Sequence, residues 1–319
     1  MTKILDVKNL NVGFNLSEGF RQAVFDVNFS LDKGEMLAIV GESGCGKTIS
    51  TMSILQLLPK SAEITSGEVW FENQDLLSLN QKQMQKIRGK KIALIPQDPM
   101  TSLNPLYTIG NQLLEIIELH QGLKGKEAFA VAVNALKKVK IPDAEEKMNA
   151  YPHQFSGGMK QRVIIAMALA CNAEIIIADE PTTALDVTVQ AQIMEILRDI
   201  KQNFGVSIIL ITHDLGIVAQ NADKVAVMYA GHIVEKATKR ELFDNPKHPY
   251  TKALLSVVLD VNSTTVESIE GHPPSIEDDI IGCPFNPRCK FVIEKCCVQK
   301  PLLKEIANNH EVSCFVAKY

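Results

Sequence analysis

The sequence predicts an α/β fold built on a parallel sheet, with an antiparallel layer and a helical region added to it. Three apolar segments predict strands of the sheet: EMLAIV, EIIIADE and VSIILIT. Each brings residues that can hold phosphate or a metal ion to its end, namely GESGCGKT after the first, the acids of EIIIADE in the second, and His213 after the third. Ligands of parallel α/β sheets gather where the strands end, so we expect these residues at one edge. The 319 residues suffice for one full-sized domain and an appendage.

GESGCGKT fits the phosphate-loop pattern, and it lies between an expected strand and the expected helix TISTMSILQLL. Its glycines allow a tight turn whose N–H groups point at phosphate oxygens, and the helix N-terminus adds partial positive charge. Lys47 is expected to reach the β and γ phosphates and Thr48 to ligate Mg²⁺. The alternative is a glycine-rich turn with a stray lysine. The expected phosphate-binding residues are Gly41, Glu42, Ser43, Gly44, Cys45, Gly46, Lys47 and Thr48, with Cys45 a spacer thiol.

Two further strand ends carry candidate chemistry. Asp179 is placed to hold Mg²⁺ through water, and Glu180 can polarise an attacking water, unless both are only solvated acids that cap a strand. His213 is expected to face the same crevice as the phosphate loop, where it either contacts the γ phosphate or serves a structural role.

A second anion-binding helix N-terminus precedes EIIIADE. Ser156, Gly157 and Gly158 open the apolar helix that contains VIIAMALAC, and one nucleotide cannot easily use both termini. If the second terminus serves a nucleotide on another copy or a partner, that nucleotide holds a dimer together. We expect Cys171, at the end of this helix, to be a buried free thiol.

Together these motifs resemble those of the ATP-binding-cassette (ABC) ATPases. GESGCGKT matches the Walker A loop, Gln97 in LIPQDPMTSLNP the Q-loop, FSGGM the signature LSGGQ, EIIIADEP the Walker B strand, TALD the D-loop with Asp186, and His213 the switch histidine. The resemblance implies ATP and Mg²⁺ as ligands, Glu180, His213 and Gln97 as catalytic residues, and Thr48, Gln97 and Asp179 around Mg²⁺. Phe155 and Met159 depart from the usual signature but leave Ser-Gly-Gly intact.

The resemblance covers about residues 1–255 and implies a nucleotide-binding domain with a RecA-like parallel sheet core, an antiparallel β subdomain and a helical subdomain over about 98–165. ILDVKNLNVGF, AVFDVNFSLDKGE and GEVWFENQDL show the alternation expected of the antiparallel layer. Phe14 is the candidate for stacking on adenine, and Phe20 is its rival.

Composition limits the partners. Apolar residues make up 46%, charged residues 22%, and the net charge is −4, which does not indicate a surface for nucleic acid. The sequence has no apolar run long enough to cross a bilayer and no secretory signal, so we expect a protein of the cytosol. The resemblance to ABC ATPases implies that it lies at the cytoplasmic face of the cell membrane. By resemblance, two such domains close head to tail over ATP, and transport requires separate membrane subunits. A soluble cassette protein acting on nucleic acid or ribosomes is the alternative, but the chain shows no internal repeat and no sustained heptads.

The C-terminal part narrows the resemblance. QDPMTSLNP, NPKHPYTKALL and GCPFNPRC resemble segments of the ATPase subunits of dipeptide and oligopeptide importers, whose close relatives import nickel. The family implies two membrane permease subunits, a substrate-binding protein, and a second similar ATPase or a second copy of this chain. We expect residues 256–319 to form a polar linker and a cysteine-rich extension.

Five of the seven cysteines lie between residues 283 and 314. Cys283, Cys289, Cys296 and Cys314 are separated by five, six and 17 residues, and some family members hold a 4Fe-4S cluster with this pattern. Four thiolates also suit zinc, and free thiols are the third possibility. Zinc sites favour closer cysteine pairs, so we expect the cluster, and the choice of Cys296 over Cys297 rests on the family spacing. Ligation would fold the short tail, and on this basis we expect Cys289→Ser to unfold it without changing ATP binding.

Overall fold

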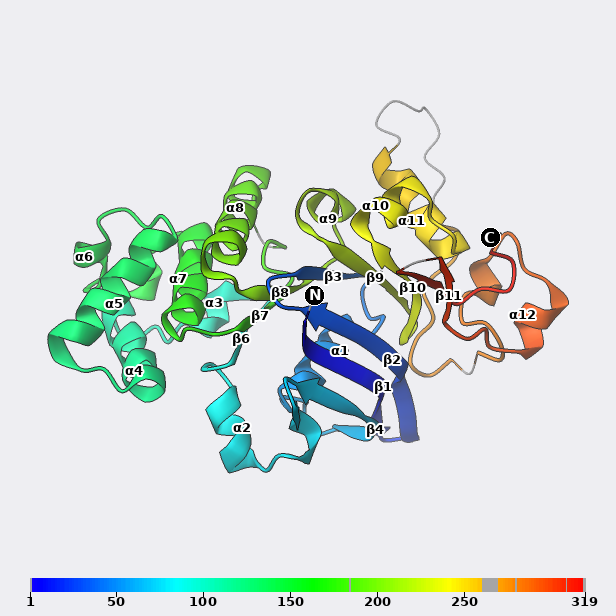
Figure 1. Cartoon of the computed structure of the whole chain (residues 1–319), viewed down its shortest axis with the longest axis horizontal. Coiled ribbons are helices and arrows are strands. Elements are labelled where there is room, and N and C mark those ends of the chain that lie inside the picture. Colours follow the sequence, from blue (N-terminus) through cyan, green and yellow to red (C-terminus); the bar gives the residue numbers. More distant parts are fainter. Residues whose placement is uncertain (1, 184, 260–268, 279, 308, 318–319) are drawn as a thin grey trace. The chain divides into compact units, whose positions relative to one another are not determined.

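The structure is a computed structural model that describes residues 2–183, 185–259, 269–278, 280–307 and 309–317. The chain divides into two compact units (Figure 1). The first unit combines Met1–Ser78 with Ile211–Tyr319, and the second unit is Leu79–Leu210.

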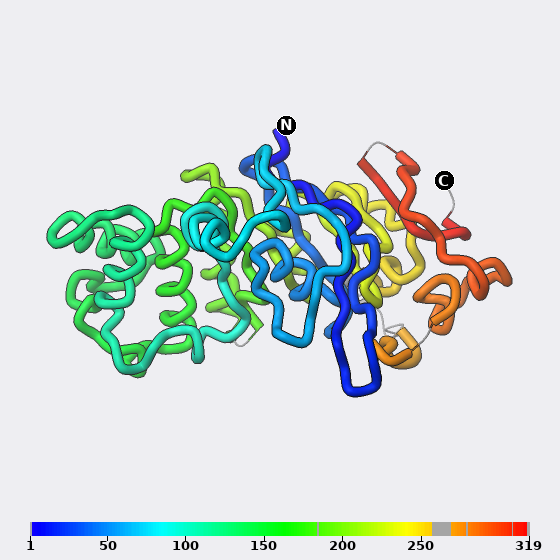
Figure 2. The backbone as a smooth tube through the Cα atoms, turned by 90° about the horizontal axis from the view of Figure 1, so that it is seen from below, coloured from blue at the N-terminus to red at the C-terminus, as the bar shows by residue number. Residues whose placement is uncertain are grey.

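The first unit contains the antiparallel layer that the alternating N-terminal segments predict. Its strand order is β2-β1-β4-β5, and Figure 2 shows β1 and β2 in blue as one long hairpin. Valine and leucine side chains on one face of β1 are buried, whereas the opposite face is partly exposed, as expected for a sheet covered on one side. The strands are β1 (Lys3–Leu16), β2 (Gly19–Asp32), β4 (Ala62–Phe71) and β5 (Gln74–Asp75), followed by a short 3-10 turn, η1 (Leu76–Ser78).

The first unit also contains a mixed sheet with the order β11-β12-β10-β9-β3. All five residues of β3 are buried, because its MLAIV sequence is apolar on both faces. β3 pairs with β9 in parallel, and the remaining neighbours are antiparallel. The strands are β3 (Met36–Val40), β9 (Lys224–Tyr229), β10 (His232–Thr238), β11 (Lys304–Ala307) and β12 (His310–Val312).

Helices of the first unit follow strands or loops of this sheet. Asp214 caps α9 and Thr238 caps α10, in each case by accepting a hydrogen bond from a backbone N–H of the first turn. The elements are α1 (Lys47–Ile54), α9 (Leu215–Asn221), α10 (Lys239–Asp244), α11 (Pro249–Leu259), η3 (Asn286–Arg288) and α12 (Glu294–Val298).

The second unit contains the helix-rich region. Its strands occur in the order β8-β7-β6, with β6 and β7 parallel. Ser156 caps α7 and Asp186 caps α8. The elements are α2 (Gln81–Ile87), β6 (Ile92–Ile95), α3 (Pro99–Ser102), α4 (Ile109–Gln121), α5 (Gly125–Lys138), α6 (Ala144–Lys147), η2 (Pro152–Gln154), α7 (Gly157–Ala170), β7 (Ile175–Asp179), α8 (Val187–Phe204) and β8 (Ser207–Thr212), the last of which leads back to the first unit.

The C-terminal tail is built into the first unit. Strand β12 pairs with β10, so the β11–β12 hairpin extends the mixed sheet (Figure 1). The carboxylate of Glu235 on β10 is fully buried, accepts hydrogen bonds from the backbone N–H groups of Lys247 and His248, and lies 2.7 Å from Nε2 of His310 on β12. This buried polar cluster joins residues 248–250, here called the HPY segment, to the C-terminal tail.

The observed boundaries differ from those that the sequence predicts. The boundary after residue 255 falls inside α11, because the apolar sequence of that helix continues to Leu259. The helix α7 runs from Gly157 to Ala170, as expected for the apolar helix that ends at Cys171. Half of the expected polar linker, residues 260–268 and 279 of 260–279, lies outside the described residues. The described part of the tail belongs to the first unit, where β12 pairs with β10.

Burial of His248 predicts a pH-dependent stability. Desolvation lowers the pKa of this histidine to about 3, whereas an unfolded histidine titrates near pH ~6.5. Protons therefore bind preferentially to the unfolded chain in this window, so the stabilisation is complete above about pH 6.5 and is lost as the pH falls toward the folded pKa. The group contributes a slope of up to about 1.4 kcal/mol per pH unit.

We expect His248→Asn to reduce this slope. The side-chain oxygen of asparagine can replace Nδ1 of His248 as the acceptor for the N–H of Tyr250, but it does not titrate. Urea unfolding measured between about pH 7 and about pH 5 should show a shallower pH dependence in the variant. His232, whose pKa burial lowers to about 4, is retained in both proteins and serves as the internal reference. Equal slopes would contradict the assignment to His248.

Candidate functional site

The loop between β3 and α1 has the backbone shape that the glycines of GESGCGKT predict. Gly41, Gly44 and Gly46 have φ angles of 154°, 79° and 102°, a region that residues with a side chain rarely adopt. A Cβ atom on Gly41 would lie 2.1 Å from the carbonyl oxygen of Met228 on β9, whereas one on Gly44 would meet nothing within 4 Å. The loop is therefore packed closely against β9 and open at Gly44, as a phosphate cradle requires.

Lys47 and Cys45 lie inside this loop. The ammonium of Lys47 is buried and donates to the carbonyl oxygens of Gly41 and Glu42 at 2.8 and 2.9 Å. The thiol of Cys45 is also buried, and desolvation raises its pKa, which keeps it protonated. Ser43 is exposed and Thr48 is half-buried in the first turn of α1.

Glu42, the second residue of the loop, is held by the C-terminal half of the chain. Its backbone N–H donates to the hydroxyl of Tyr250 at 3.0 Å, and its carboxylate accepts two hydrogen bonds from Arg288, at 2.7 and 3.1 Å. Sequence reasoning missed Tyr250 and Arg288. The HPY segment and the NPRC sequence drew attention to both regions, but nothing in their spacing indicates a contact with the loop.

In the second unit, the structure brings Gln97 and Glu180 together. Both follow the C-terminal ends of neighbouring parallel strands, β6 and β7. The carboxylate of Glu180 accepts from Nε2 of Gln97 at 3.0 Å and from the hydroxyl of Thr183 at 2.9 Å. Glu180 has a φ of 44°, an uncommon value for glutamate that is typical of functional sites. Asp179, the last residue of β7, is buried beside it in sequence.

The start of α7 has the predicted form. The hydroxyl of Ser156 accepts from the N–H of Met159, and Ser156 itself is exposed. A Cβ atom on Gly158 would lie 2.5 Å from Cγ1 of Val189, so this glycine allows α7 to pack on α8. Gly157, between Ser156 and Gly158 in the sequence, is half-buried. Asp186 accepts from the N–H of Val189 and caps α8, while Ala184 of the D-loop lies outside the described residues.

His213 and Phe14 lie in the first unit. His213 follows β8, is exposed, and directly precedes Asp214, the cap of α9. Phe14 on β1 is half-buried and pairs in register with Arg21. Phe20 is 45% exposed, and its ring covers Gly13, where a Cβ atom would lie 2.1 Å from Cζ of the ring. Both candidates for adenine stacking, Phe14 and Phe20, therefore retain accessible surface.

Four cysteines gather in the tail. The pKa of Cys283 is raised to about 11, chiefly by burial, with smaller raising contributions from the neighbouring Cys296, Cys314 and Cys289. Cys283 and Cys296 are buried and joined by a backbone hydrogen bond of 2.8 Å, whereas Cys297 is exposed. Within the described part of the chain, no group of three or more histidine, cysteine or acidic side chains is arranged as a metal site. The structure therefore does not show the predicted iron-sulfur or zinc site.

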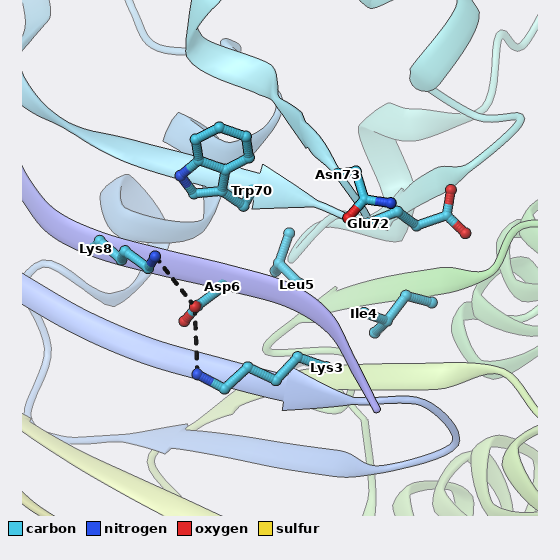
Figure 3. Close-up of a pocket in the computed structure, with 8 residues that line it drawn as sticks. All are labelled: Lys3, Ile4, Leu5, Asp6, Lys8, Trp70, Glu72 and Asn73. Carbon is cyan, nitrogen blue, oxygen red and sulfur yellow. Dashed lines mark hydrogen bonds and ion pairs between the residues drawn. The ribbon is translucent and has the colours of Figure 1, made fainter. Parts of the chain in front are cut away.

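A pocket of about 330 Å³ lies on the antiparallel layer and contains none of the motif residues. Figure 3 shows Asp6 between Lys3 and Lys8, with Trp70 beyond them, and the two ion pairs are 3.3 and 3.7 Å long. The lining residues are Lys3, Ile4, Leu5, Asp6, Lys8, Trp70, Glu72 and Asn73. Asp6 pairs with both lysines, and none of the motif residues lines the pocket, so the pocket adds nothing to the candidate site.

Comparison with known families and proteins agrees with these motifs. Residues 24–183 match the family "ABC transporter", and residues 234–296 match "Oligopeptide/dipeptide transporter, C-terminal region". The dipeptide transport ATP-binding protein DppD of Bacillus subtilis (strain 168) is 50% identical over 99% of this chain and 95% of its own length. The oligopeptide transport ATP-binding protein OppD of Haemophilus influenzae (strain ATCC 51907 / DSM 11121 / KW20 / Rd) is 49% identical over 93% of this chain and 92% of its own length.

Solved structures give the same result for the cassette. The dimeric structure of MJ0796, a bacterial ABC transporter cassette, superposes with a TM-score of 0.66 at 31% identity, and covers 74% of this chain and 99% of its own. Family model, relatives and fold agree, so this chain belongs to the ATP-binding subunits of ABC transporters that carry the oligopeptide/dipeptide transporter C-terminal region.

Proposed function

We propose that this chain binds and hydrolyses ATP to energise the import of dipeptides or oligopeptides through separate membrane subunits. The observation that carries this proposal is that the first unit contains both the phosphate loop, with its positive glycine φ angles, and the segment that matches the C-terminal region of peptide transporters. The relatives named for dipeptide and oligopeptide transport match over nearly the whole chain, which supports peptides over nickel as the cargo.

Each motif residue has a proposed role. The loop residues 41–48 hold the phosphates, with Lys47 on the β and γ phosphates and Thr48 on Mg²⁺, the ion that neutralises charge on the transferring phosphoryl group. Asp179 holds Mg²⁺ through water. Gln97 contributes to the metal site and, through its hydrogen bond to Glu180, orients the carboxylate that polarises the attacking water. His213 contacts the γ phosphate, and Phe14 stacks on adenine.

The second helix N-terminus completes the site in a dimer. Ser156, Gly157 and Gly158 of one protomer would face ATP on the phosphate loop of a second copy or a similar ATPase, with Asp186 next to the closing interface. A nucleotide moves an equilibrium from mostly open to mostly closed only if it favours the closed form by about 5.5 kcal/mol. Contacts with two protomers supply such a difference, and hydrolysis removes it.

The second unit offers a surface for the membrane subunits. Met100, Leu106 and Tyr107 follow Gln97 and are 58%, 81% and 54% exposed. Large apolar side chains exposed together mark interaction sites, and their proximity to Gln97 in sequence would connect ATP hydrolysis to the permeases. No described helix is long and apolar enough to cross a membrane. We propose a peripheral location at the cytoplasmic face, two permease subunits and a substrate-binding protein as partners, and no role for nucleic acid.

For the cysteine tail, we propose that Cys283, Cys289, Cys296 and Cys314 hold a 4Fe-4S cluster with a structural role. Four soft thiolates are the donor set of such a cluster. Burial and, to a smaller extent, the neighbouring cysteines disfavour unligated thiolates in the tail, so a bound metal would stabilise them. The exposure of Cys297 supports the choice of Cys296 as the ligand. Zinc is the alternative occupant.

Glu180→Gln tests the hydrolytic role. The amide keeps the size of the side chain but cannot act as a base, so we expect ATP binding to persist, turnover to be abolished and an ATP-bound dimer to accumulate. Phosphate release and size-exclusion chromatography with ATP measure these effects. Glu195→Gln is the matched control, because Glu195 is an exposed carboxylate on α8 whose partner is Lys140. Normal turnover in Glu180→Gln would remove Glu180 from its role.

Uptake in cells tests the cargo. Cells that lack this chain should fail to accumulate a labelled dipeptide or oligopeptide, and the wild-type gene but not Glu180→Gln should restore uptake. Uptake of labelled nickel is measured in the same cells to test the alternative cargo. Restoration of nickel uptake without peptide uptake would contradict the peptide proposal and establish the nickel alternative.

Metal content tests the tail. Protein purified without oxygen should contain about four irons and about four acid-labile sulfides per chain, with a broad visible absorbance. Cys297→Ser should retain them, and Cys289→Ser should lose them. One zinc without sulfide would replace the cluster by a zinc site, and loss of iron in Cys297→Ser would show that the ligand set is wrong.

A further inference from the structure

The tail contacts the phosphate loop through one buried side chain. Arg288 belongs to η3, between Cys283 and Cys289, and its side chain is only 5% exposed. Its Nη1 and Nη2 atoms donate to the two carboxylate oxygens of Glu42 at 2.7 and 3.1 Å. A guanidinium fork on both oxygens of a carboxylate fixes orientation as well as distance. More than two hundred residues of sequence separate the partners, so the folded tail supplies this contact.

Arg288 is itself held rigidly. Its Nε atom donates to the carbonyl oxygen of Glu270 at 3.0 Å, and Nη1 also donates to the hydroxyl of Tyr229 at 3.3 Å. The guanidinium lies over the Tyr229 ring, 5.8 Å from its centre. Arginine at this position is therefore a permanent cation with a fixed direction.

An aromatic cluster supports the same residue of the loop. Tyr250 of α11 accepts the backbone N–H of Glu42, and its ring lies 4.6 Å from that of Tyr229. Phe285 of the tail packs against both rings, at 5.2 and 5.4 Å. The N–H, the carboxylate and, through Lys47, the carbonyl oxygen of Glu42 all have partners within the first unit.

The charge of Glu42 gives the pairing a second effect. Burial raises the pKa of the Cys45 thiol in the middle of the loop, Lys47 lowers it, and the carboxylate of Glu42 adds a smaller raising effect. An unpaired carboxylate at this position would oppose the negative charge of a triphosphate. Arg288, a residue of the tail, neutralises the charge of the Glu42 carboxylate by pairing with it.

We propose that Arg288 is a positioning residue for the ATP site: by holding and neutralising Glu42, it makes the nucleotide affinity of the phosphate loop depend on the folded tail. The proposal rests on the proposed ATP-binding function and adds a partner within the chain. It also revises the expectation that Cys289→Ser leaves ATP binding unchanged, because Cys289 directly follows Arg288 and ends the same turn.

The test is equilibrium binding of a fluorescent ATP analogue with Mg²⁺ to the full chain. Arg288→Met keeps the length of the side chain and its packing on Tyr229 but removes the charge and the fork. We expect about tenfold weaker binding, with the maximal hydrolysis rate at saturating ATP changed much less than the KM. The combination of Arg288→Met with Glu42→Gln should bind no more weakly than Arg288→Met alone, because both changes disrupt one interaction. Cys289→Ser should also weaken binding.

Lys236→Met is the matched control. It breaks the 2.9 Å ion pair between β10 and Glu311 of β12, and so loosens the tail without touching the loop. We expect nucleotide affinity within about twofold of wild type. If Arg288→Met does not fold, Arg288→Lys tests the proposal instead, because lysine keeps the positive charge but cannot form the two-pronged contact. We expect a loss of nucleotide affinity in Arg288→Lys that is smaller than about tenfold, whereas a purely structural role of Arg288 would leave the affinity unchanged. Wild-type affinity in a folded Arg288→Met, or effects of Arg288→Met and Glu42→Gln that multiply, would overturn the proposal. Failure of the wild-type chain to bind ATP would instead refute the proposed function.

Discussion

The loop after β3 must keep several backbone N–H groups pointed at one small volume, and the rest of the first unit is arranged around this constraint. The required φ angles at Gly41, Gly44 and Gly46 are unfavourable for most residues and do not form a regular hydrogen-bonded ladder. The loop therefore depends on neighbours for its shape. β9 supplies close packing at Met228, Lys47 supplies hydrogen bonds from within, and Tyr250 and Arg288 hold Glu42 from the C-terminal half.

This dependence explains why the tail is part of the core. Phe285, Cys283 and Cys296 belong to the same buried cluster as Val40 of β3 and Tyr229 of β9. Glu235 joins β10 to the HPY segment and to β12 through one buried carboxylate. Breaking a buried polar cluster leaves unpaired groups and is strongly destabilising, so the tail and the strand beside the phosphate loop are held together. Metal binding by the cysteines would stabilise the same end of the unit.

Local patterns predicted most of the elements. Features that depend mainly on neighbouring residues along the chain lie where the sequence predicts them. They are the apolar strands β3, β7 and β8, the phosphate loop, the capped start of α7, the antiparallel layer and the buried thiol of Cys171. The pairing of β12 with β10 and the contact of Arg288 with Glu42 could not be predicted. Both join residues far apart in sequence, and neither hydrophobic period nor motif spacing identifies such partners. The strand β6 before Gln97, the hydrogen bond between Gln97 and Glu180 and the positive φ of Glu180 were not predicted either.

Amide hydrogen exchange of the full chain is the most direct measurement of the central claim, that the conformation of the phosphate loop is held from the tail. Wild-type protein and Arg288→Met would be compared by mass spectrometry, peptide by peptide. The account predicts faster exchange over residues 41–48, while α2 in the second unit exchanges as in the wild type. Unchanged exchange in the loop, or the same acceleration in every peptide, would contradict it.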